Sequence, residues 1–227
     1  MTDFADLERR LEAARAREQV ELDKFGPESS GDLTLYVQLR DQRLEAERVL
    51  SLARGEETTM LLEWPVPWDG GAPLPHLLAN GHATMLLYYA LDIDPGWDGT
   101  TVHVTDPSSP AVRRLALAQF EWCHAITFGG PNDEVFGGHR LVGHGFGGGY
   151  DAFEVRNSRW VKAAIAVNSV HHRFDPDNWK DLRHFFLAFH DETVEVLARG
   201  YRVEELTVPF KEALELAKER LEGVWEE

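Results

Sequence analysis

The sequence predicts an α+β fold in which an antiparallel β-sandwich or half-barrel carries a helical hairpin at its N-terminus and a helix at its C-terminus. Residues 1–56 repeat apolar side chains every three or four positions, which is typical of amphipathic helices. From residue 57 onward, short apolar runs alternate with Pro, Gly, Asn and Asp, as in antiparallel strands and their turns. We therefore divide the chain into a hairpin at 1–56 and a β-rich main domain at 57–227.

The hairpin is expected to contain two helices. Residues 3–24 contain neither Gly nor Pro, and a break rich in helix-stopping residues follows at 25–31. Asp32 is then placed to cap the second helix, and Gly55 is placed to end it. Both apolar stripes are narrow, so they need cover from the main domain or from a second copy of the chain in a homodimer.

Apolar and aromatic runs predict the strands of the main domain. The predicted strands are 58–64, 83–91, 101–104, 115–128, 150–155 and 184–189. The run Phe-Phe-Leu-Ala-Phe at 185–189 is apolar on both faces, so this strand is expected at the centre of a sheet with cover on each side. Ser158 is placed to cap a short helix at 157–168, and Thr207 is placed to cap the C-terminal helix, with Pro209 in its first turn.

A glycine-rich segment from Phe128 to Asp151 is the part of the chain that most resembles a binding site. It holds nine of the 19 glycines, two histidines and an acid pair. The letters of the dinucleotide fingerprint occur at 143–148, but a strand-like run follows them where that motif needs a helix. The side chains predicted to frame a polar pocket are Asn132, Asp133, Glu134, His139, His144, His171, His190 and Asp191.

Two interpretations of the loop histidines remain open. His139 and His144 with Asp133 would suit a zinc or iron site with free coordination positions. Alternatively, the rings bond the backbone of an irregular loop, and the residues after Pro131 simply form a turn. The leading interpretation therefore requires no cofactor, and zinc or iron belongs to the alternative.

Composition narrows the functional classes. A net charge of −16 argues against binding nucleic acid, because phosphate neutralisation needs clustered basic side chains. No apolar run is long enough for a membrane helix, and the first residues lack the pattern of a signal peptide. The single cysteine, Cys123, fits a reducing cytoplasmic location and is expected to be a buried, inert thiol within the strand at 115–128.

Several short motifs resemble a group of uncharacterised bacterial proteins. The motifs are FGGPNDE from Phe128, GHRL from Gly138, NSRW from Asn157, NSVH from Asn168 and RHFFLAFHD from Arg183. The resemblance implies no activity, fold or cofactor. Arg140 departs from the group, which has Pro at this position, so the resemblance implies a looser turn here.

The sequence leads to three functional hypotheses. The first is a ligand- or protein-binding domain in which the Gly/His-rich loop frames a pocket. The second is a metal-dependent, hydrolase-like enzyme in which histidines and an acid hold an ion that activates water. The third is an acidic interaction or immunity-type protein that attracts its partner through surface charge.

Overall fold

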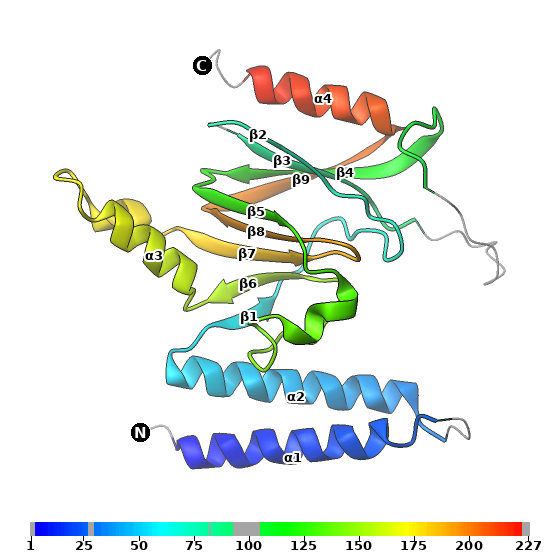
Figure 1. Cartoon of the computed structure of the whole chain (residues 1–227), viewed down its shortest axis with the longest axis vertical. Coiled ribbons are helices and arrows are strands. Elements are labelled where there is room, and N and C mark those ends of the chain that lie inside the picture. Colours follow the sequence, from blue (N-terminus) through cyan, green and yellow to red (C-terminus); the bar gives the residue numbers. More distant parts are fainter. Residues whose placement is uncertain (1–2, 27–29, 82, 93–104, 224–227) are drawn as a thin grey trace.

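Two antiparallel sheets packed face to face form the centre of the molecule (Figure 1), which confirms the predicted α+β sandwich. The computed structural model describes residues 3–26, 30–81, 83–92 and 105–223. The strand predicted at 101–104 lies outside these residues.

Each sheet has a strand order that differs from the chain order. The five-stranded sheet runs β1 (Thr58–Leu61), β6 (Ala152–Arg156), β7 (Arg183–Ala188), β8 (Thr193–Ala198) and β5 (Ala125–Gly129). The four-stranded sheet runs β2 (His76–Ala79), β3 (Thr84–Tyr89), β4 (Val112–Glu121) and β9 (Gly200–Pro209).

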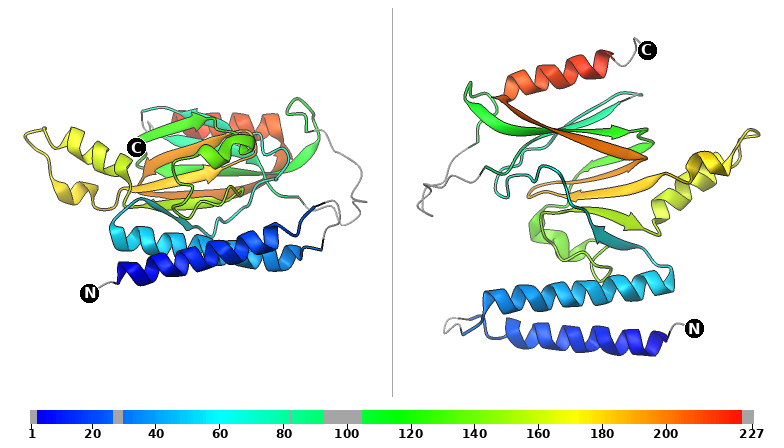
Figure 2. Two further views of the ribbon diagram at one scale, coloured as in Figure 1. Left: turned by 60° about the horizontal axis from the view of Figure 1, so that its bottom comes forward. Right: turned by 180° about the vertical axis from the view of Figure 1, so that it is seen from behind.

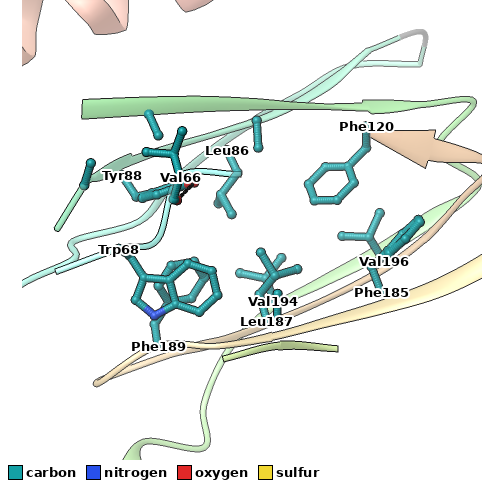
Figure 3. Packing of buried hydrophobic residues seen from close by; sticks show 14 of the residues in the cluster. Val66, Trp68, Leu86, Tyr88, Phe120, Phe185, Leu187, Phe189, Val194 and Val196 are labelled. Carbon is teal, nitrogen blue, oxygen red and sulfur yellow. Dashed lines mark hydrogen bonds between the residues drawn. The ribbon is translucent and has the colours of Figure 1, made fainter. Parts of the chain in front are cut away.

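Strand β7 lies at the centre of the five-stranded sheet, as the sequence predicted. Phe185, Leu187 and Phe189 point into the core between the sheets, where Phe189 meets Trp68 and Tyr88 and Phe185 lies opposite Phe120 (Figure 3). The alternate residues Phe186 and Ala188 point to the opposite face and pack beneath the glycine-rich segment. Both faces of this strand are therefore covered, which explains its unbroken apolar sequence.

Helices form the outer layers (Figures 1 and 2). Helix α4 (Phe210–Gly223) covers the four-stranded sheet and buries Phe210, Ala213 and Ala217 against it. On the opposite side, the glycine-rich segment lies on the five-stranded sheet, α2 (Leu33–Arg54) lies on that segment, and α1 (Phe4–Leu22) lies outermost. In the described part of the chain, no helix combines the length and apolar character needed to cross a bilayer.

The helix ends follow the expected chemistry. The Asp32 carboxylate accepts hydrogen bonds from the backbone N–H groups of Thr34 and Leu35, and Gly55 ends α2 in a left-handed conformation. Ser158 caps α3 (Arg159–Asn168) by accepting from the N–H of Val161. These sequence predictions are confirmed.

Buried charges join the two helices of the hairpin. The Glu47 carboxylate accepts from Arg43 at 2.8 Å and from Arg15 at 3.3 Å, while Arg43 also pairs with Glu18. The charges satisfy one another where few apolar side chains are buried. The hairpin also leaves Val20 and other apolar side chains exposed, and dimerisation through it stays a prediction.

The predicted strand at 115–128 is wrong. Strand β4 ends at Glu121 in one sheet and β5 begins at Ala125 in the other, so 122–124 carry the chain between sheets. Trp122 makes this turn with a φ of 51°. The neighbouring residues include no Gly, Asn or Pro that would predict a turn there.

The predicted cap of the C-terminal helix is also wrong. Thr207 lies in β9, where it pairs with Arg114 of β4, and Pro209 ends β9. Helix α4 therefore begins only at Phe210. The sequence prediction missed β2, β8 and β9. Strand β9 contains adjacent Glu204 and Glu205 and has no fully buried side chain, so its pattern lacks the apolar alternation on which the prediction relied.

Candidate functional site

The glycine-rich segment is a packed layer between the five-stranded sheet and α2. Its 3₁₀ helix η1 (Asp133–Gly138) and the following turns bury Phe136, Leu141 and Phe146 against Phe153 and Phe186 of the sheet. Aromatic rings thus fill the face of the sheet that this segment covers. The segment does contribute Gly143 and His144 to a small cavity of about 260 Å³ beside α1 and α2.

Polar side chains of α2 hold the far side of this segment. The Arg48 guanidinium donates to the carbonyl oxygens of Gly145 and Thr59, each at 3.0 Å. The Glu47 carboxylate accepts from the Gly145 N–H at 3.3 Å. Helix α2 therefore meets both backbone groups of Gly145.

The metal site predicted from His139, His144 and Asp133 is not formed. His144 points to α2, where its Nδ1 lies 3.0 Å from the Ser51 hydroxyl, while the Tyr150 hydroxyl donates to Asp133. Among the described residues, no group of three or more His, Cys, Asp or Glu side chains is arranged to hold a metal ion. The short spacing of the two histidines in the sequence suggested a shared site. In the structure His144 contacts α2 while His139 packs on the sheet, so the two rings have different surroundings.

His139 is part of the packing beneath the segment. Its ring stacks on Phe186 with centroids 4.8 Å apart and an interplanar angle of 4°. Its Nδ1 accepts a hydrogen bond from the N–H of Leu141 at 3.3 Å. Burial lowers the pKa of His139, against the opposing effect of the Glu195 carboxylate.

A buried polar cluster around Glu195 was missed by the sequence analysis. Oε2 of Glu195 lies 2.8 Å from Nε2 of His184, but the ring N–H does not point at that oxygen. Arg140 also forms an ion pair with this carboxylate. Nδ1 of His184 lies 2.8 Å from Oγ of Ser158. Burial alone would raise the pKa of Glu195, but His184, Arg140 and His139 together hold it below its usual range.

Serine, histidine and acid in contact invite comparison with acyl-transfer enzymes. Here Oγ of Ser158 already accepts the capping N–H of Val161, and Ser158 and His184 are both buried. A substrate carbonyl has no access to this oxygen. The three groups instead join α3 to strands β7 and β8.

We expect acid to destabilise the protein through His139. Its pKa is lower folded than unfolded, where it is about 6.5. The unfolded chain therefore binds more protons as pH falls below about 6.5, and stability falls until the pH passes the folded pKa. The variant His139→Phe keeps a stacked ring but cannot protonate, so its free energy of unfolding should fall less between pH 7.5 and pH 5.5.

Urea denaturation of both proteins at the two pH values checks this expectation. The comparison uses the change with pH, because losing the acceptor for Leu141 lowers the stability of the variant at both pH values. An equal pH dependence in the two proteins would show that His139 is not the responsible group.

A second cluster lies at the end of β7 near η1. The His190 ring lies 2.8 Å from Asp191 and 3.7 Å from Asp133, and the Tyr150 hydroxyl donates to Asp133. The hydrogen bond with Asp191 raises the pKa of His190, with Asp133 and Glu134 adding to the effect. The bond to Asp133 raises the pKa of Tyr150 to about 12. Both shifts favour the protonated groups, so neither side chain is prepared to act as a general base.

The structure brings together only some of the predicted pocket residues. Asp133, Glu134, His190 and Asp191 share the cluster at the η1 end of β7, and Asn132 directly precedes them as the residue before η1. The His171 ring lies tilted against that of its neighbour His172 beyond α3, and Figure 1 shows α3 and η1 at opposite ends of β7. The prediction that His171 joins the glycine-rich segment is therefore wrong, because the chain leaves the sheet after β6.

An open concave feature lies at the α3 end of the sandwich. An open groove of about 890 Å³, the Trp122 groove, is formed where the β4–β5 turn and the start of β9 face the short 3₁₀ helix η2 (Pro176–Trp179). Its lining includes Trp122, His124, Trp179, Leu182, Arg199 and Arg202.

Contacts across this groove hold its aromatic side chains in place. The Arg199 guanidinium lies over the Trp122 ring, 4.9 Å from its centroid, and donates to the carbonyl of Asn178 at 2.8 Å. The His124 ring meets Trp179 edge-on with centroids 5.0 Å apart. Trp122 itself is 75% exposed.

Cys123 lies in the turn of this groove and not within a strand, which corrects its predicted place. Its sulfur lies 3.6 Å from the Ala125 carbonyl, and the side chain is partly buried. Burial raises the pKa of the Cys123 thiol, which disfavours the reactive thiolate.

No protein-family model, curated protein or solved structure matches this chain. The resemblance to a bacterial group therefore stays a prediction.

Proposed function

We propose that this chain is a non-catalytic protein-binding domain and that the Trp122 groove is its contact face. Trp122 carries this proposal. A non-glycine residue with a left-handed φ costs roughly 1–2 kcal/mol of stability. Leu74, with a φ of 40°, offsets that cost by packing its partly buried side chain against the core under α4, whereas Trp122 remains 75% exposed. A large, strained and exposed indole is a feature expected of a binding site, because tryptophan and arginine dominate binding hot spots.

The segment beside the groove supports the same proposal. Residues 159–182, the projecting segment, leave the sheets between neighbouring strands β6 and β7 and extend away from the body (Figures 1 and 2). None of these residues is buried, although α3 is amphipathic and its end exposes Val167 and Val170, the latter to 87%. A segment that contributes so little to the core is suited to contact another molecule.

Replacement of Trp122 by Gly should separate binding from stability. Glycine adopts a φ of 51° without strain, so the free energy of unfolding should change by less than about 1 kcal/mol despite the lost contact with Arg199. Peptides selected on the wild-type protein from a library of random 15-residue sequences should lose at least about tenfold in affinity. Titration calorimetry and urea denaturation measure the two effects.

Two matched variants sharpen this comparison. Leu74→Gly also relieves a positive φ but removes a side chain packed under α4, so it should lower stability and leave peptide affinity within about twofold. His190→Ala changes the opposite end of β7 and should leave the affinity unchanged. Selected peptides that bind Trp122→Gly as tightly as the wild type would overturn the proposal.

A further inference from the structure

The projecting segment carries a charge opposite to that of the rest of the chain. Its 24 residues include four basic and three acidic side chains, a net charge of +1, which leaves −17 on the other 203 residues. Arg159 contacts Glu57 at the start of the segment. Lys162, Arg173 and Lys180 are exposed, and none of them forms an ion pair with another described residue.

The Trp122 groove adds two more cations beside this segment. Arg199 uses one face of its guanidinium on Trp122, and Arg202 is 72% exposed while it contacts Glu121 at 3.0 Å. Of the described side chains that line the groove, Glu121 is the one acid. The groove therefore offers aromatic surface together with guanidinium groups, and its cations outnumber its carboxylates.

We propose that the partner presents an acidic segment with an apolar or aromatic anchor, which deepens the proposed function and rests on it. Carboxylates pair with Lys162, Arg173 and Lys180, and the anchor packs against Trp122 in the groove. Arginine beside an indole suits such a segment because guanidinium binds carboxylate in a fork while its flat face stays on the ring.

The net charge of the chain points to a basic partner, but local charge decides the contact. At 0.1 M ionic strength the screening length is about 10 Å, so negative charges on distant parts of the body are largely screened. Charges in direct contact are screened much less. The partner therefore responds to the basic projecting segment more than to the acidic body.

Three defined peptides of 15 residues test this inference. Each has a central Trp. The first surrounds it with Asp and Glu, the second has Asn and Gln in their place, and the third has Lys and Arg. At 0.1 M salt the acidic peptide should bind at least about tenfold more tightly than its neutral twin, and 0.5 M salt should remove most of that difference.

Charge reversal locates the contact. The triple variant Lys162→Glu, Arg173→Glu and Lys180→Glu should weaken the acidic peptide at least about tenfold. The control Arg17→Glu, Lys211→Glu and Lys218→Glu makes the same change in net charge on exposed positions of α1 and α4, and should change the affinity less than about twofold. Circular dichroism of both triple variants verifies that they are folded.

The outcomes separate this inference from the proposed function. Suppose that a neutral or basic peptide binds the wild type as tightly as the acidic peptide does and fails to bind Trp122→Gly. That result would overturn the inference of an acidic partner but would support the groove as the binding site. Equal losses in the two triple variants, or no measurable binding of the acidic peptide, would also overturn it. Tighter binding of a single-stranded oligonucleotide with the same charge as the acidic peptide would also overturn it. The same holds if sedimentation experiments show that a second copy of the chain occupies this face.

Discussion

Gly145→Ala should lower the free energy of unfolding by about 2–4 kcal/mol. Gly145 has a φ of 90°, and an added Cβ would lie 2.6 Å from Cγ of Arg48 and 3.0 Å from Oγ1 of Thr59. The methyl group therefore adds backbone strain and displaces the Arg48 side chain that joins α2 to the glycine-rich segment. Urea denaturation at pH 7.5 measures the loss.

A matched glycine in the same segment provides the control. A Cβ at Gly137 meets no atom within 4 Å and the position has no positive φ, so Gly137→Ala should change stability by less than about 0.5 kcal/mol. Equal effects at the two positions would contradict the view that α2 rests on a close backbone approach at Gly145.

Glu47→Ala should lower the free energy of unfolding by about 3 kcal/mol. The carboxylate is buried and accepts from Arg43, Arg15 and the Gly145 N–H, so its removal leaves that N–H without its acceptor and leaves the partly buried Arg43 guanidinium with Glu18 as its remaining carboxylate. The control Glu45→Ala removes an exposed carboxylate that contacts Arg48 at 3.4 Å on the same helix, and should cost less than about 0.5 kcal/mol. Similar losses from the two glutamates would contradict the buried network.

Gly145→Ala and Glu47→Ala act at one contact, so their losses of unfolding free energy should not be additive. The methyl group at 145 already moves the N–H that Glu47 binds, so the double variant should lose less than the sum of the single losses. Full additivity would show that helix and loop are stabilised independently.

Local chemistry made much of the fold predictable. Asp32, Ser158 and Gly55 mark helix ends because a capping oxygen or a left-handed glycine is needed at those positions wherever the helix packs. The apolar run at 185–189 indicated a central strand since both of its faces have to leave water. These signals depend on a few neighbouring residues, which is why one sequence suffices.

The turn at Trp122 could not be predicted in the same way. Its left-handed backbone occurs in a run of apolar residues, and the pairing of β4 with β9 and of β5 with β8 sets the place where the chain changes sheets. Long-range pairing therefore overrides local preference. The groove that we propose as the binding site depends on this turn, so the groove could not be predicted from the sequence.

The glycine-rich segment misled for a related reason. Its histidines and acids suggested chemistry, yet contacts with α2 and β7 decide that His144 binds Ser51 and His139 stacks on Phe186. Glu195 offered a usable signal, since a charged residue between Val194 and Val196 must find partners on the covered face of its sheet. Such a residue identifies a buried polar cluster even before its partners are known.

Amide hydrogen exchange with and without a selected peptide locates the contact that we propose at the Trp122 groove. Added peptide should slow exchange at 119–124, 178–182 and 199–202, around the Trp122 groove. Protection confined to 132–134 and 190–191, where Asp133 and His190 lie at the other end of β7, would contradict this proposal.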